Sequence, residues 1–169
     1  MNTRHQHTLL ALALLALIVA GCDASGGVRL NIGDQAPAFV APTLAAGPLS
    51  FPGELRGRPV VIRFWADWCR FCADEMRAID GVWQRHRQQG LVVLAINAGQ
   101  SRQEVESFIR RIGVGYPVLL DDQAAISRRY GVVGLPTTYF VAGDGRIRGK
   151  LLGEADAATF ERLASELLR

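Results

Sequence analysis

Histidine and cysteine, two side chains that commonly bind zinc, are scarce in this chain of 169 residues. There are three of each, and His5 and His7 stand together near the start. A structural zinc site takes four such ligands. His5, His7 and Cys22 belong to the N-terminal leader and its cleavage signal, so only His86 remains to join Cys69 and Cys72. On a shared helix His86 would lie roughly 20 Å from Cys72. No metal site is therefore expected.

The chain also lacks a concentration of positive charge. Its net charge is +3, and its basic residues are nearly all arginine and are scattered. The pairs Arg110-Arg111 and Arg128-Arg129 fall on expected helices, where they are interpreted as solvated faces. Because the basic residues form no patch or stripe that could bind phosphates, no nucleic-acid partner is expected. Because 49% of the residues are apolar, the chain can bury the core of one domain.

No apolar run is long enough to span a membrane, which takes about 20 residues. The longest covers residues 9–20, follows a polar start with Arg4, and is typical of a signal-peptide core. It ends in Val19-Ala20-Gly21-Cys22, which resembles the lipobox of bacterial lipoproteins. We expect a lipoprotein signal peptide at 1–21, a lipidated Cys22 with a tether at 22–31, and a folded domain at 32–169. The alternative is an ordinary signal peptide with a chance cysteine.

Two cysteines, Cys69 and Cys72, lie where a buried strand turns into a helix. The apolar run at 59–65 predicts the strand, and the helix that follows is expected to bury Cys72, Met76, Ile79 and Trp83. The start of a helix favours a thiolate. Cys69 is therefore expected to be the exposed nucleophile of low pKa, with Cys72 lying deeper. A purely structural disulfide is disfavoured, because closing so short a loop removes little chain entropy.

The rest of the chain alternates between apolar runs and amphipathic stretches. Strands are expected at 91–97, 116–120, 137–141 and 147–152. Helices are expected at 101–112, opened by the capping box of Ser101 and Glu104, at 124–130, and after Asp156. The continuous apolar runs indicate a sheet that is covered on both faces. These elements predict an α/β fold.

Several motifs resemble a known family. The stretch Phe64-Trp65-Ala66-Asp67-Trp68-Cys69-x-x-Cys72 is similar to the active site of thioredoxin-fold proteins. Three further motifs resemble the TlpA/ResA-like thiol-disulfide oxidoreductases: Gly33-Asp34-x-Ala36-Pro37-x-Phe39, Leu55-Arg56-Gly57-Arg58-Pro59-Val60-Val61 and Gly134-Leu135-Pro136-Thr137-Thr138. The resemblance runs from about residue 32 to the end. It implies a thioredoxin-like fold, with a central mixed β-sheet flanked by helices, an N-terminal hairpin extension and a strand-helix insertion.

The resemblance also implies roles for particular residues. Cys69 would attack a substrate disulfide and Cys72 would resolve the mixed disulfide. Pro136 would follow a cis peptide bond and pack against the dithiol. No cofactor is implied. The residues implied to contact the substrate are Trp68, Arg70, Phe71, Leu135, Pro136 and Thr137.

The implied function is reduction of disulfides in secreted or periplasmic proteins, with apocytochrome c as one possible substrate. A membrane thiol carrier would donate the electrons, and a lipid anchor would hold the domain on the periplasmic side of the inner membrane, as Asp23 after Cys22 hints. A disulfide oxidase or isomerase with the same site is the alternative, because Arg70 favours the thiolate and Phe71 replaces the family's usual proline. A peroxiredoxin would need its reactive cysteine in a Pro-x-x-x-Thr-x-x-Cys context, and a copper chaperone of the same fold would need C-x-x-x-C and a distant histidine. Cys69 and Cys72 fit neither pattern, so both alternatives are disfavoured.

One charged residue interrupts the buried strand. Arg63 is expected on the same face as Val61 and Trp65, and it needs a partner there. Glu75 follows Cys72 by one helical turn, where the TlpA/ResA resemblance implies a catalytic glutamate that accepts a proton from Cys72. We expect Arg63 to pair with Glu75, or failing that with Asp67. Pairing would keep Glu75 ionised and blunt its use as an acid near neutral pH.

Overall fold

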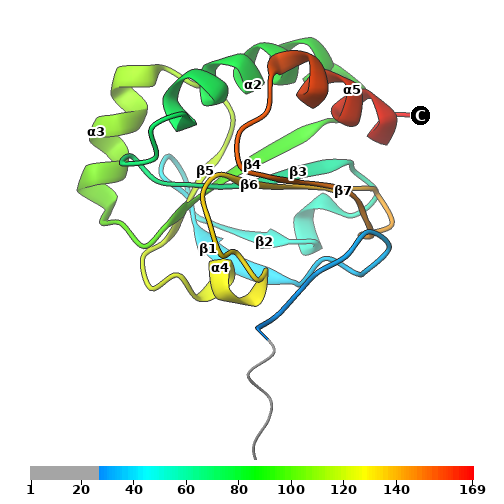
Figure 1. The fold of residues 1–169 in the computed structure, drawn as a ribbon, viewed down its shortest axis with the longest axis horizontal. Helices are drawn as coiled ribbons and strands as arrows, with labels where there is room; N and C mark the ends of the chain where they lie inside the picture. Colours follow the sequence, from blue (N-terminus) through cyan, green and yellow to red (C-terminus); the bar gives the residue numbers. More distant parts are fainter. Residues whose placement is uncertain (1–26) are drawn as a thin grey trace, which may run out of the picture.

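A five-stranded sheet forms the centre of the computed structural model, which describes residues 27–169 (Figure 1). The strands lie in the order β5-β4-β3-β6-β7. Strands β3, β4 and β5 are parallel, whereas β6 is antiparallel to both β3 and β7. This mixed sheet confirms the predicted thioredoxin-like fold. The strands are β3 (Val60–Trp65), β4 (Val92–Ala98), β5 (Val118–Asp121), β6 (Thr137–Val141) and β7 (Ile147–Leu152).

The two faces of the sheet are covered differently (Figure 1). One face carries the long helices α2 (Cys72–His86), α3 (Arg102–Ile112) and α5 (Ala157–Leu167). The other carries the short helix α4 (Ala125–Arg129) and an antiparallel hairpin of β1 (Phe39–Pro42) and β2 (Pro48–Phe51). Two short 3-10 turns, η1 (Gly53–Leu55) and η2 (Arg87–Gln89), complete the chain. The hairpin extension and the inserted α3–β5 unit are both present.

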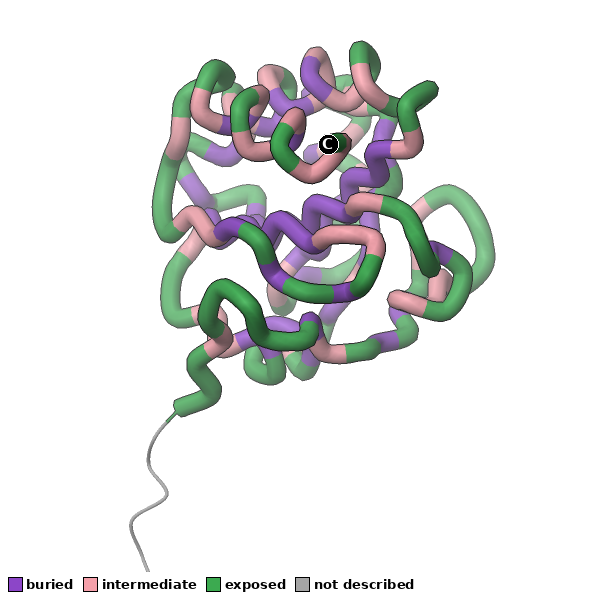
Figure 2. The backbone as a smooth tube through the Cα atoms, turned by 90° about the vertical axis from the view of Figure 1, so that its right-hand side faces the viewer, coloured by how far each residue is buried: buried purple, intermediate pink, exposed green. Residues whose placement is uncertain are grey.

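Strand β3 divides the core because all six of its residues are buried and its side chains alternate between the faces. Val61 and Trp65 pack under the long helices. Ile62 and Phe64 pack against the hairpin and α4. Figure 2 shows the buried stretches gathered in the middle of the fold and the exposed ones outside.

Most expected boundaries agree with the structure to within two residues, but the buried stripe of α2 does not end as predicted. Val82 is fully buried there, whereas Trp83 is only half-buried. The reason is tertiary: α5 covers the Val82 flank of α2, through contacts of Arg85 and His86 with Glu161. Trp83 lies on the other flank and meets Tyr116 edge-on, with ring centroids 6.1 Å apart.

The predicted signal peptide and Cys22, the predicted site of lipidation, lie outside the described residues. Within residues 27–169, no helix is long and apolar enough to cross a membrane. The same part of the chain contains no cluster of three or more histidine, cysteine, aspartate or glutamate side chains able to hold a metal ion.

Candidate functional site

The two central cysteines form a disulfide at the carboxyl end of β3. The Cα atoms of Cys69 and Cys72 are 5.4 Å apart. Cys72 is the first residue of α2, and its N–H donates to the Cys69 carbonyl over 3.0 Å. Cys69 itself lies in the turn before the helix rather than in its first helical turn.

The exposure of Cys69 corrects the sequence expectation. Cys69 is only 7% exposed and Cys72 is completely buried. Cys72 is the deeper of the two, as predicted, but Cys69 is not an exposed side chain in this oxidised state. Its sulfur is bonded to that of Cys72, the buried first residue of α2, and that bond holds Cys69 against the protein. Reduction of the disulfide would remove this constraint.

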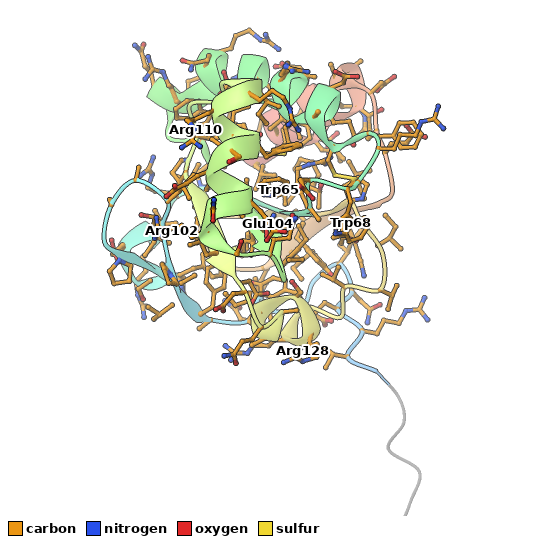
Figure 3. The ribbon with its side chains drawn as sticks, turned by 90° about the vertical axis from the view of Figure 1, so that its left-hand side faces the viewer. Trp65, Trp68, Arg102, Glu104, Arg110 and Arg128 are labelled. Atoms are coloured by element: carbon orange, nitrogen blue, oxygen red, sulfur yellow. A yellow bond between two sulfur atoms is a disulfide. The ribbon has the colours of Figure 1, made fainter. Side chains whose placement is uncertain are left out.

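Two exposed aromatic residues, here called the apolar rim, adjoin the disulfide cysteines in the chain. Trp68 is 70% exposed and Phe71 is 44% exposed, which is unusual for aromatic side chains of this size. Figure 3 shows Trp68 at the surface and Trp65 inside the fold. The Arg70 guanidinium lies over the Phe71 ring, 5.5 Å from its centroid. The chain neighbours of the two cysteines therefore offer exposed aromatic surface and one positive charge.

The loop before β6 lies at the same end of the sheet. Thr137 is in register with Phe64, so the residues just before Thr137 lie near the end of β3 that leads to Cys69. The Leu135–Pro136 peptide bond is cis, as the family resemblance implied. Thr137 Oγ1 donates to the Gly134 carbonyl over 2.7 Å and fixes the turn. The fold thus brings both predicted groups of substrate-contacting residues to one end of the sheet.

A polar network that the sequence analysis missed holds the loop between β3 and the disulfide. The Asp67 N–H donates to Gln100 Oε1 over 2.8 Å, and Gln100 Nε2 donates to Asp67 Oδ1 over 2.6 Å. Asn97 Nδ2 also donates to Gln100 Oε1, over 2.9 Å. Asn97 is buried and Gln100 is 8% exposed. The sequence signal that could have indicated this network is the appearance of polar residues, Asn97 and then Gln100, at and just after the end of the otherwise apolar strand β4.

Arg63 and Glu75 form the predicted ion pair. Arg63 Nη2 lies 2.6 Å from Glu75 Oε2, and the Arg63 residue is 1% exposed. Arg63 Nη1 also donates to Thr138 Oγ1 over 3.0 Å. Asp67, the alternative partner expected for Arg63, binds Gln100 instead. The buried guanidinium is thus neutralised and shares its hydrogen bonds with β6.

Both carboxylate oxygens of Glu75 are engaged. Oε2 binds Arg63, and Oε1 accepts the Ala155 N–H over 2.6 Å. Glu75 therefore joins the first turn of α2 to β3 and to the segment that leads into α5. Among the described residues, no hydrogen bond joins Glu75 to either cysteine.

Tyr116 supports α2 at Met76, the residue after Glu75. Its hydroxyl donates to the Met76 carbonyl over 3.1 Å. Burial raises the pKa of Tyr116 well above its usual value, although the nearby Arg63 charge works in the opposite direction. The phenol is therefore a permanent neutral donor that fixes the helix behind the disulfide.

Comparison with known proteins adds independent evidence. Residues 32–150 match the model of the AhpC/TSA family. The chain is 30% identical to the thiol-disulfide oxidoreductase ResA of Geobacillus thermodenitrificans over 145 residues, which cover 86% of this chain and 83% of the relative.

Two solved structures are similar throughout the domain. One, from Chlorobium tepidum, is described as a candidate thiol:disulfide interchange protein DsbE; its TM-score is 0.78 at 25% identity, over 83% of this chain and 99% of that one. The other, from Bacteroides thetaiotaomicron, is described as a candidate protein disulfide isomerase; its TM-score is 0.75 at 26% identity, over 82% of this chain and 91% of that one.

Proposed function

Since the chain belongs to the AhpC/TSA family and is a thiol-disulfide oxidoreductase with ResA among its relatives, we propose that its Cys69–Cys72 pair reduces disulfides in proteins outside the cytosol. The observation that carries this proposal is the disulfide itself, which lies at the start of α2 and is adjoined in the chain by the apolar rim. Trp68 and Phe71 of that rim would contact the polypeptide around a substrate disulfide.

The reaction transfers two electrons from the Cys69–Cys72 dithiol to the substrate disulfide. In the reduced enzyme the Cys69 thiolate attacks one sulfur of the substrate disulfide, and the other substrate sulfur leaves as a thiolate that takes up a proton. Cys72 then loses its proton and attacks the Cys69 sulfur, which releases the second substrate thiol. The substrate is reduced and Cys69–Cys72 is oxidised. A membrane dithiol donor would restore the reduced enzyme by the reverse exchange.

The other residues of the proposed site bind the substrate and assist the two cysteine sulfurs. Leu135, Pro136 and Thr137, which lie at the same end of the sheet, are proposed to contact the substrate through the chain around the cis peptide bond. Glu75 is proposed to accept the proton of Cys72, one helical turn away. Arg70 would stabilise the thiolate of Cys69.

A trapping experiment tests the division of labour between the cysteines. Cys72→Ser should accumulate mixed disulfides on Cys69 that reducing agent releases, because the resolving thiol is missing. Cys69→Ser is the matched control and should trap little. Reduced wild-type protein should also be alkylated first at Cys69. Stronger trapping by Cys69→Ser, or first alkylation at Cys72, would reverse the assignment.

The location is part of the proposal. The apolar leader and the Val19-Ala20-Gly21-Cys22 sequence support lipidation of Cys22, and Asp23 supports retention on the periplasmic side of the inner membrane. Mass spectrometry of the membrane fraction should find an acylated N-terminus at Cys22. An uncleaved leader, or cleavage at another bond, would contradict it.

An oxidase or isomerase is the second candidate. Arg70 beside the disulfide favours the thiolate, and a more stable thiolate makes the oxidised form a stronger oxidant. A redox titration against glutathione separates the two. A potential near that of thioredoxin, about −270 mV, supports the reductase, whereas one between about −180 and −120 mV supports an isomerase or oxidase.

A further inference from the structure

The first described residues lie directly against the loop that leads to Pro136. Gly131 has a φ of +63°, and a Cβ atom there would lie 1.8 Å from the Val28 carbonyl oxygen. Only glycine allows so close an approach of two backbones. The segment that begins at residue 27 is therefore fixed beside Gly131, five residues before Pro136 in the chain.

Two aliphatic side chains near this contact are exposed. Val133 is 95% exposed and Val28 is 52% exposed. Single exposed apolar residues are common on protein surfaces. Here, however, both lie within two residues of one backbone contact, at the point where the chain leaves the described structure.

Three arginines adjoin the same contact: Arg29 follows Val28, and Arg128 and Arg129 end helix α4 just before Gly131. Arg128 Nη1 donates to the Gln123 carbonyl over 2.7 Å, and Arg129 Nη1 donates to the Ala38 carbonyl over 2.6 Å. These carbonyls hold the guanidinium groups in place without cancelling their charge.

The acidic residues of the adjoining segments do not neutralise this charge. Asp34 accepts the Asn31 N–H and Asp122 accepts the Gln123 N–H. Among residues 27–169, neither forms an ion pair with the three arginines. On α3, by contrast, Arg102 and Arg110 both pair with Glu106. Figure 3 shows Arg110 and Arg128 at opposite ends of the molecule.

The length of chain before Val28 limits what can cover this surface. Val28 is the sixth residue after Cys22, and a fully extended chain spans at most about 3.3–3.6 Å per residue, or roughly 20 Å in all. If Cys22 carries the lipid anchor proposed above, Val28 cannot lie further than that from the membrane surface, and Arg29 follows it by one residue. A bilayer is then the nearest surface available to these side chains.

We propose that Val28, Arg29, Arg128, Arg129 and Val133, together the anchor-proximal face, rest on an anionic phospholipid surface. The inference depends on lipidation of Cys22. The guanidinium groups bind lipid phosphates, and the two valines enter the headgroup layer. Val133 is three residues from Pro136, about 10 Å at most. The loop that leads to Pro136, at the same end of the sheet as the disulfide, therefore lies close to the membrane surface.

Hydrogen–deuterium exchange on the full-length anchored protein tests this orientation. The protein is reconstituted into vesicles of phosphatidylcholine, with or without phosphatidylglycerol. Peptides that cover residues 27–33 and 128–136 should exchange more slowly on the anionic vesicles, whereas residues 102–112 should not change. Concentrated salt should weaken the protection, because it screens the arginine charges.

Matched variants identify the side chains responsible. Each basic residue near an anionic surface gives about a fivefold preference for the bound orientation, so Arg128→Gln with Arg129→Gln should reduce that preference about 25-fold. Arg110→Gln with Arg111→Gln removes the same charge from α3 and should have no effect. Val133→Asp is a second test at an exposed position, and it should also abolish protection. Thermal unfolding checks that each variant is folded.

Each outcome is informative. Equal exchange on both kinds of vesicle would overturn the orientation, and so would an equal loss of protection in the Arg110→Gln, Arg111→Gln control. In either case co-sedimentation with vesicles still reports whether the anchor is present. Protection that appears only when a protein partner is added also overturns it. Absence of co-sedimentation overturns the anchor and the orientation together. Disulfide exchange in detergent reports the Cys69–Cys72 chemistry separately.

Discussion

At the scale of single residues, Arg63 places a positive charge in the centre of a fully buried strand. A buried ion pair contributes little net stability over an apolar pair, but removal of one partner leaves an uncompensated charge. Thr138 and Glu75 share the guanidinium, and Glu75 in turn holds the Ala155 N–H. This arrangement joins β3, β6, α2 and the start of α5 behind the disulfide.

Glu75→Gln should lower the free energy of unfolding by about 3–5 kcal/mol, because Arg63 stays charged and loses its carboxylate. The double variant Arg63→Met with Glu75→Gln should cost less than the sum of the single changes, by more than about 1 kcal/mol. Urea unfolding of the four proteins measures both. Strictly additive costs would contradict the coupling.

The same variants decide the catalytic role of Glu75. If Glu75 accepts the Cys72 proton, Glu75→Gln should slow the resolution step and change its pH profile. Single-turnover exchange measured across pH on folded protein separates this from a structural effect. An unchanged rate and pH profile would leave Glu75 as a positioning residue only.

At the scale of elements, α5 is fastened to the end of α2 by one carboxylate. Glu161 binds both Arg85 and His86. Burial alone would raise the pKa of Glu161, but the hydrogen bonds from Arg85 and His86 outweigh it and lower the pKa below its usual value. A carboxylate whose pKa is lower in the folded state stabilises the fold above its unfolded pKa, and that contribution is lost as the pH falls through the folded value.

Glu161→Gln should therefore destabilise the protein at neutral pH and make progressively less difference as the pH falls below about 4, the usual range of the unfolded carboxyl. The loss at pH 7 should be about 1 kcal/mol or less, because the pair is partly solvated. Urea unfolding at several pH values measures it. Glu166→Gln, which removes an exposed pair on the same helix, is the control. A difference that grows at low pH would contradict the linkage.

At the scale of the whole molecule, the sheet separates two cores with different tasks. The core under the long helices contains the disulfide. The other is sealed by aromatic rings of the hairpin and α4: Phe39 stacks on Phe51 at 5.2 Å and meets Tyr130 edge-on at 6.1 Å. The hairpin core therefore supports the sheet from the face away from the chemistry.

Phe39→Ala should lower the free energy of unfolding by about 3–5 kcal/mol, because it opens a cavity among these rings. The rate of disulfide exchange should not change while the protein is folded. Val40→Ala, on the same strand but 67% exposed, should change stability by less than about 0.5 kcal/mol. Calorimetry and an exchange assay measure the two effects, and slower exchange in folded Phe39→Ala would show that the cores are coupled.

The sequence by itself determined the elements, the place of the dithiol and one buried ion pair. Strands β6 and β7 have the expected bounds, and Asp156 caps α5 as predicted. These features follow from local periodicity, because a strand repeats every two residues and a helix every 3.6. The same alternation assigned Arg63 to the face of Val61, whereas the family resemblance drew attention to Glu75, one helical turn after Cys72, as its partner.

Only the tertiary structure decided the features that depend on segments far apart in the chain. The burial of Cys69, the choice of Val82 over Trp83, and the network that joins Asp67 to Gln100 all depend on which element packs over another. So does the contact of Val28 with Gly131, across about a hundred residues. Local patterns report which face of an element is apolar, but they carry no information on which distant backbone covers it.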